Sequence, residues 1–440
     1  MTPRLRQRAE AGSAFARPSV IFALTWTVVT GLFSISWLRS EIPVNLATIL
    51  LIGGSISAFF YIEHLTGFSR RSGGGSPPCQ DPEAARQLGE ECIRRLKRTF
   101  FGIWAVGITF MIVVQGGFPM LWNLIGDGRG YAEFGLPTLN GALNAIWLSV
   151  IVLSLRDYLL TGERRFALHI LLLLSYCVMI FSRGLLVLAC LNLAGCFLLG
   201  RRIKLRQGLQ IGLFALVGLY LMNFLAENRN SGSKDSIRRF IADTSGVVFE
   251  ESFLGDMKRS LIWIEMYAVA PLSNLNFNIS TIQPQYYPNY TLRGLFPSVL
   301  REYVFRIQDL EYEDRYGLVM VNTAFNTFTF YANYLRDFGL WGCAGILLIV
   351  QLLASRFYHL AVGGDIGAMV GYAGIFAALV LSPFTDYFGT LLIIAQISIA
   401  AYIRSKLRQA VHGGPARRAG RRAPKALPSA APSGNASAGI

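Results

Sequence analysis

Two arginines stand where the sequence could bind a phosphate group. Arg183 lies in a short turn, Ser182-Arg-Gly184, between two apolar runs, and Arg259 precedes Trp263 by one helical turn. An arginine so close to hydrocarbon is costly unless it pairs or reaches water. Its planar guanidinium suits phosphate oxygens, which it binds through two donors. These positions predict an anion site beside a membrane surface, with snorkelling of Arg183 to the interface as the alternative.

Polar aromatic residues gather in one later segment. Tyr286, Tyr287 and Tyr290 are followed by Arg293. Tyrosine faces suit sugar rings, although tyrosines also pack ordinary loops. The segment therefore predicts either a carbohydrate contact or a plain packing cluster.

One carboxylate stands at the edge of an apolar run. Asp337 follows Arg336 just before that run begins, so it is either a catalytic carboxylate or half of an anchoring ion pair. No G-x-x-x-x-G-K-[ST] loop occurs in the sequence, which argues against direct nucleotide hydrolysis. No metal-ligand pattern is evident either, so we expect no metal and no cofactor.

Apolar runs must position these residues. The 440 residues are 53% hydrophobic and only 15% charged, and about 20 apolar residues cross a bilayer. The sequence predicts an all-α, polytopic membrane protein with about ten transmembrane helices. The expected spans are 19–38, 43–62, 99–116, 138–155, 166–181, 184–200, 208–225, 338–355, 366–382 and 388–403.

The basic residues predict an orientation. Net charge is +15, and most Lys and Arg residues fall in alternate connecting segments, which the positive-inside rule places in the cytoplasm. The N-tail 1–18, the linker 64–98 and a disordered basic tail 404–440 are then cytoplasmic. All four histidines fall at or near that side. We expect a multi-pass protein of the bacterial inner membrane, in contact with its lipid; nucleic-acid binding is the poorer explanation of the charge.

One large polar segment remains on the outer, periplasmic side. It covers 227–337 and separates spans 1–7, within 19–226, from spans 8–10, within 338–403. Helical signals occur at 236–242, 256–270 and 291–308, whereas 274–290 reads as irregular. A loop this long is usually functional, so we expect a periplasmic loop that contains short helices.

Three stretches together resemble bacterial O-antigen polymerases of the Wzy type, which join oligosaccharide repeat units. They are Gly117-Phe-Pro119, Phe181-Ser-Arg-Gly184, and Asn326-Thr-Phe-Thr-Phe with Asp337-Phe-Gly-Leu-Trp-Gly342. The resemblance runs from about 99 to 403. It implies a metal-independent glycosyltransferase of the GT-C class that moves a growing glycan from undecaprenyl pyrophosphate to a new lipid-linked repeat unit.

The resemblance also implies roles for particular residues. Arg183 and Arg259 match the arginines that bind pyrophosphate, and Arg306 with Gly317 fits an R-x10-G pattern. Asp337 is the first choice for a proton acceptor, with Glu265 and Asp256 behind it. The residues expected to bind substrate are Tyr290, Arg293, Arg306, Asn326 and Arg129.

Two other functions remain open from the sequence. O-antigen ligases resemble these polymerases, but they carry a histidine where this chain has Asn322 and Asn326. A flippase for lipid-linked glycans would line a central cavity with charge, and the spans here are nearly free of charge. Expected partners are undecaprenyl-pyrophosphate-linked oligosaccharides, a chain-length regulator and a flippase.

Overall fold

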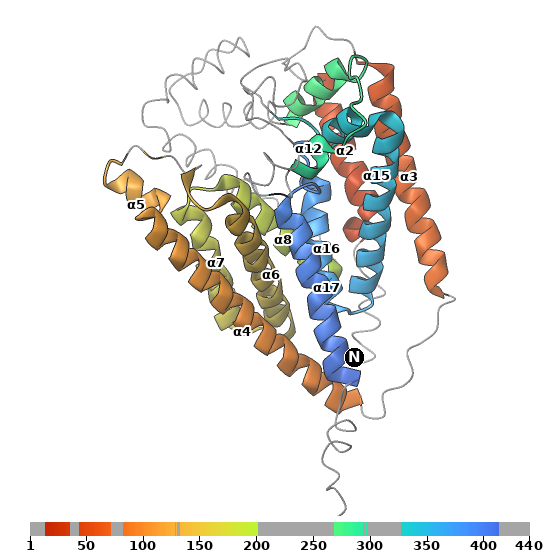
Figure 1. The fold of residues 1–440 in the computed structure, drawn as a ribbon. Helices are drawn as coiled ribbons and strands as arrows, with labels where there is room; N and C mark the ends of the chain where they lie inside the picture. Colours follow the sequence, from red (N-terminus) through yellow and green to blue (C-terminus); the bar gives the residue numbers. More distant parts are fainter. Residues whose placement is uncertain are drawn as a thin grey trace, which may run out of the picture.

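The computed structural model describes residues 14–35, 44–71, 82–127, 129, 133–200, 268–293, 296 and 327–412. Within this part of the chain all the regular structure is helical and no strand is present, in agreement with the all-α prediction (Figure 1). The elements in chain order are η1 (Ala14–Ala16), α2 (Pro18–Ile35), α3 (Leu46–Arg71), α4 (Pro82–Gln115), α5 (Pro119–Leu124), α6 (Pro137–Thr161), α7 (Arg164–Met179), α8 (Arg183–Gly200), a helical segment 268–278, α12 (Asn289–Arg293), α15 (Tyr331–Val362), α16 (Ile366–Leu381) and α17 (Leu391–His412).

The apolar helices indicate a membrane protein. In the described part, four stretches are long and apolar enough to cross a bilayer: Leu46–Gly67, Arg86–Leu124, Thr138–Thr161 and Tyr331–Val362. Pro18–Ser34, Arg183–Leu199 and Ile366–Leu381 are shorter apolar helices. Every predicted span overlaps a helix except 208–225, which lies outside the described residues.

Helix α16 forms the centre of the bundle. It packs against α2, α8, α15 and α17, and most of its residues are buried. Glycines make this packing close: a Cβ at Gly371 would lie 2.4 Å from Cε1 of Phe357 in α15 and 3.0 Å from Cβ of Ala400 in α17. In a membrane the hydrophobic effect does not drive helices together, and small residues allow the close packing that stabilises their contact.

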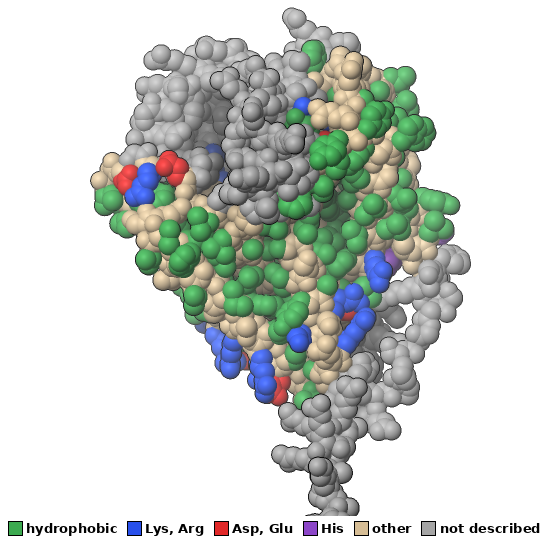
Figure 2. All heavy atoms as spheres, in the orientation of Figure 1, with side chains coloured by type: hydrophobic (Ala, Val, Ile, Leu, Met, Phe, Trp, Pro, Cys, Tyr) green, Lys and Arg blue, Asp and Glu red, His purple; other side chains and the backbone are tan. Residues whose placement is uncertain are grey.

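Charged side chains gather at one end of the bundle. At one end, Arg156 of α6 pairs with Glu90 of α4, and Nε of Arg404 in α17 lies 2.6 Å from a carboxylate oxygen of Asp365 before α16. Figure 2 shows Lys and Arg side chains gathered at this end, with hydrophobic side chains covering the flanks of the helices. We call it the basic end.

The opposite end contains the start of α15, which begins seven residues before the predicted span. The chain breaks its helical path at Gly339, where φ is +66° and ψ is −168°. A Cβ there would lie 2.9 Å from Cγ of Pro284, so the close approach of the loop requires glycine. Residues 331–338 thus form a separate helical piece, and Asp337 is helical rather than the last residue of a loop.

Other predictions for the polar segment have mixed outcomes. Residues 268–278 are helical, which confirms only the last residues of the helix expected at 256–270; residues 256–267 lie outside the described residues. The irregular reading of 274–290 was wrong for its first residues. Of the helix expected at 291–308, residues 291–293 belong to α12, which begins at Asn289 and is described only to Arg293. Most of 227–337 lies outside the described residues. Helix α17 runs on to His412, past residue 404, where the tail was expected to begin.

Candidate anion site at the end opposite the basic residues

Arg336 is the centre of the candidate site. Only 8% of its surface is exposed, and its Cζ lies 3.6 Å from the centroid of the Tyr290 ring. Its Nη1 has no hydrogen-bond partner among the described residues, and none of their carboxylates forms an ion pair with it. A buried N–H donor without an acceptor costs free energy. The guanidinium is therefore held ready for an anion that completes its hydrogen bonds.

Asp337 secures the aromatic platform beneath Arg336. The side chain is fully buried, and its oxygens accept hydrogen bonds from the backbone N–H of Tyr290, at 3.0 and 3.1 Å, and of Thr291, at 2.6 Å. These bonds occupy the carboxylate and tie the start of α12 to the start of α15. Its contacts favour a positioning role, while the catalytic role expected from the sequence stays a prediction.

A second carboxylate, Asp386, lies in the turn 382–390 between α16 and α17. It accepts hydrogen bonds from Oη of Tyr334 at 2.9 Å and from the backbone N–H of Gly389 at 3.1 Å, with Nδ2 of Asn333 at 3.5 Å. Its partial burial disfavours the charged form, which raises its pKa above the ordinary value despite these bonds. The side chain stays partly exposed. Asp386 is thus an oriented carboxylate able to take up a proton.

The two carboxylates belong to one cluster. Tyr334 bonds Asp386 and stands two residues before Arg336 in the same helical piece. A Cβ at Gly389 would lie 3.3 Å from the carbonyl oxygen of Thr291, so α12 also packs against the turn 382–390. Phe330 N–H donates to the carbonyl of Ser382 at 3.0 Å, which fixes the start of α15 beside the end of α16.

The Arg183 turn lies beside this cluster. Helix α7 ends at Met179 and α8 begins at Arg183, with Phe181 at a φ of +49° in the tight connection. A Cβ at Gly184 would lie 4.0 Å from Oη of Tyr387, next to Asp386. Arg183 is partly buried. The structure therefore brings one predicted arginine to the neighbourhood of the site.

Arg129 belongs to a different cluster. Its guanidinium stacks 4.2 Å from the Trp122 ring centroid, bonds Asp127 at 2.6 and 2.8 Å, and donates to the Gln115 carbonyl at 2.7 Å. The bond to Arg129 lowers the pKa of Asp127. The side chain is exposed, and its contacts stay within the connection between α4 and α6. It has the surroundings of an interfacial anchor.

The remaining predicted site residues are placed in part or not at all. Tyr290 is buried under Arg336, as described, and the backbone of Arg293 ends α12. Arg259, Arg306 and Asn326 lie outside the described residues, so their roles stay predictions.

One functional residue that was not among the predicted ones, Asp386, does carry a signal in the sequence. Asp386 is the sole acid in a short connection between two apolar runs, Ser382-Pro-Phe-Thr-Asp-Tyr-Phe388. An acid confined there must meet a hydrogen-bond donor or water. Arg336, by contrast, could be noticed from its position in the sequence. That its Nη1 lacks a hydrogen-bond partner among the described residues could not be predicted from the sequence.

Comparisons with known proteins do not identify a family for this chain. No family model matches the chain, and searches of curated proteins and of solved structures find no match. Within the described part, no group of three or more His, Cys, Asp or Glu side chains could hold a metal ion. The site is therefore interpreted from its own contacts.

Proposed function

We propose that this protein is a membrane glycosyltransferase that polymerises lipid-linked oligosaccharide repeat units. It transfers the growing glycan from undecaprenyl pyrophosphate to a new lipid-linked unit, in the synthesis of a surface polysaccharide. The observation that carries the proposal is the buried guanidinium of Arg336, with an unmatched Nη1 at the end of the bundle opposite the basic end. Such a group suits the phosphate of a lipid whose chain lies in the bilayer.

The alternation of helix ends supports a periplasmic site in a multi-span topology. Helices α4, α7 and α16 begin at the basic end, and α3, α6, α8, α15 and α17 finish there (Figure 1). The basic end is the cytoplasmic one under the positive-inside rule. Helix α8 finishes at the basic end and α15 begins at the other, which is what an odd number of spans between them requires. The ten-span topology with its 227–337 loop is part of the proposal.

The proposed reaction assigns a role to each described group. The acceptor hydroxyl oxygen attacks the anomeric carbon of the donor sugar, the bond from that carbon to the pyrophosphate oxygen breaks, and the lipid pyrophosphate leaves with the electron pair. Arg336 neutralises the charge that develops on it. Asp386 accepts the hydroxyl proton. Tyr334 orients Asp386, and Asp337 holds Tyr290 against Arg336.

Two related functions predict other phenotypes, so a surface-polysaccharide gel of a deletion strain tests the proposal. Loss of a polymerase leaves single repeat units on the surface and removes the long-chain ladder. Loss of an O-antigen ligase removes every unit from the surface, and loss of a flippase traps precursors inside. Complementation with the wild-type chain must restore the ladder. A normal ladder in the deletion strain would refute the proposal.

A further inference from the structure

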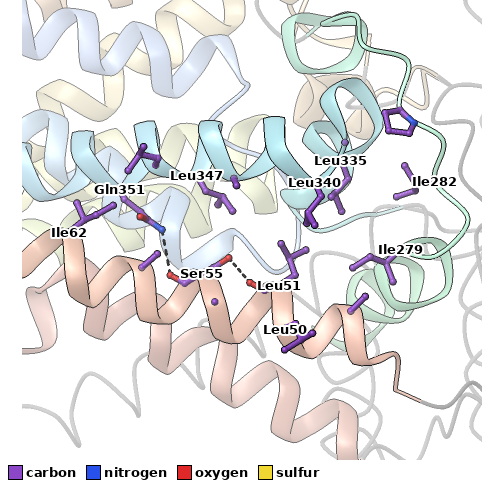
Figure 3. A pocket seen from close by; sticks show the side chains of 17 residues that line it. Leu50, Leu51, Ser55, Ile62, Ile279, Ile282, Leu335, Leu340, Leu347 and Gln351 are labelled. Carbon is purple, nitrogen blue, oxygen red and sulfur yellow. Dashed lines mark hydrogen bonds between the residues drawn. The ribbon is translucent and has the colours of Figure 1, made fainter.

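An apolar groove runs between α3 and α15. It encloses about 690 Å³ and is lined along one side by Leu50, Gly54 and Ile62 of α3, and along the other by Leu340, Leu347 and Gln351 of α15. Figure 3 shows Leu50 and Ile62 of α3 facing Leu340, Leu347 and Gln351 of α15 across the space, with Ile279 and Ile282 at one end. Gly339 and Gln351 are twelve residues apart, so the groove extends roughly 18 Å along α15.

Small residues keep this space open. A Cβ at Gly54 would meet nothing within 4 Å, and Ala47, Ala58 and Ala344 also line the groove. Neighbouring side chains such as Leu46, Leu340 and Leu348 are exposed. Both helices are long and apolar enough to span a membrane, so these exposed faces meet lipid. A groove that opens there is accessible to a hydrocarbon chain from the bilayer.

One end of the groove adjoins the anion site. Leu335 and Pro284 line this end of the groove. They directly precede Arg336 and Gln285, and the backbone N–H of Gln285 donates to the carbonyl of Arg336 at 2.8 Å. At the other end, Gln351 is buried; its Nε2 lies 3.4 Å from the Ser55 carbonyl, and its Oε1 has no hydrogen-bond partner among the described residues. This polar amide marks the end of the groove, because a hydrocarbon chain cannot form a hydrogen bond with it.

We infer that the groove between α3 and α15 holds the part of the lipid carrier's isoprenoid chain nearest its phosphate, while Arg336 holds that phosphate. The inference rests on the proposed function for the identity of the carrier. One groove beside the Arg336 guanidinium fits a lipid that carries one chain on its phosphate headgroup. A diacyl lipid would leave its second chain outside. Residues 279–284 cover the outer end, so the chain enters sideways between the two helices.

Adjacent glycines on α3 allow a matched test. Gly54→Leu fills the groove, whereas Gly53→Leu adds the same side chain to an exposed position that does not line it. Neither added Cβ meets an atom within 4 Å, and both changes raise helix propensity equally. Ala344→Leu blocks the groove from the α15 side and serves as a second blocking variant. Thermal unfolding of the purified full chain checks that all three variants are folded.

The measurement is a native mass-spectrometry titration of the purified chain with undecaprenyl phosphate, geranyl phosphate and phosphatidic acid. Gly54→Leu and Ala344→Leu should weaken binding of undecaprenyl phosphate about fivefold, a modest factor because the chain leaves one apolar medium for another. They should weaken binding of the short geranyl phosphate less, because its chain fills only part of the groove, and Gly53→Leu should change neither. Equal affinities in Gly54→Leu and Gly53→Leu would overturn the groove assignment. A loss confined to phosphatidic acid would overturn the isoprenoid occupant.

The same measurement separates this inference from the proposed function. If the deletion strain keeps its ladder while Gly54→Leu still weakens undecaprenyl phosphate binding, the polymerase assignment fails and the groove assignment stands. If the ladder is lost but the two glycine variants bind alike, the groove assignment fails alone.

Discussion

Replacing Arg336 by Met should separate activity from stability. The change removes the guanidinium and keeps an apolar side chain of similar length against the Tyr290 ring. In the wild type, Nη1 is buried without a described partner, and such a donor costs about 1–3 kcal/mol. The variant also loses the cation–π contact, which is worth about 1–2 kcal/mol when it is desolvated. These two effects nearly cancel, so the free energy of unfolding should change by roughly 1 kcal/mol or less.

Activity should respond very differently to the same change. A preorganised donor at a developing charge contributes roughly 3–4 kcal/mol to transition-state stabilisation, which is a factor of about 10²–10³ in rate. The assay is chain elongation by the reconstituted protein supplied with lipid-linked repeat units, with the products separated on a gel. Arg336→Lys should recover only part of the rate, because it lacks the planar donor fork.

A matched control is Arg95→Met in α4. This arginine is exposed at the basic end, where it pairs with Glu91, and an exposed pair of this kind contributes little. Its rate and stability should stay near those of the wild type. An Arg336→Met protein that elongates normally would refute the anion role. A loss of activity that only parallels a loss of folded protein would show that Arg336 is structural.

The other predictions concern the groups around this site and the core. Asp386→Asn keeps the size of the side chain but not the proton acceptor, so the rate should fall about 10²–10⁴-fold. The wild-type rate should rise with pH through a pKa above the usual Asp value. This rise with pH should be absent in the variant. A wild-type profile that is flat across acidic pH would contradict that role. Asp337→Ala removes the bonds to two backbone N–H groups and should cost about 2–4 kcal/mol, with faster hydrogen exchange at the Tyr290 amide; unchanged exchange would count against it. Gly374→Ala places a Cβ 2.6 Å from Oε1 of Gln396 and should cost about 1–3 kcal/mol in detergent unfolding, whereas Gly345→Ala, which meets nothing within 4 Å, should not destabilise.

The sequence predicted the long helices well because each of them contains a long apolar run, whereas the short α5 and α12 do not. Segments such as 138–155 and 366–382 needed only composition and length, and α6 and α16 follow them closely. The start of α15 was harder to place. Asn333, Arg336 and Asp337 make residues 331–338 look polar, and only tertiary contacts with α12 and the turn 382–390 explain why polar residues are helical and buried there.

The candidate site was predictable only in outline. Arg183 could be picked because a charge in a turn between two apolar runs needs a reason to be there. Asp386 carried the same signal, but its importance depends on two hydrogen-bond donors. Tyr334 is distant in the sequence, and the backbone N–H of Gly389 cannot be recognised from residue type. Arg336 required the structure, because a missing hydrogen-bond partner is a property of packing and has no counterpart in residue type or spacing.

The Arg336-Asp337 pair explains why both charges stay available at this end of the bundle. Neighbouring residues on a helix point in different directions, so the two side chains need not neutralise each other although they are adjacent in the sequence. The carboxylate is occupied by backbone N–H groups of α12, and the guanidinium lies on the ring that those bonds hold in place. If the two groups had formed an ion pair, the carboxylate would have neutralised the guanidinium and occupied donors that could bind a phosphate. Asp337 therefore supports anion binding best by bonding the backbone instead of the arginine, and its removal should weaken binding by releasing Tyr290 from beneath Arg336.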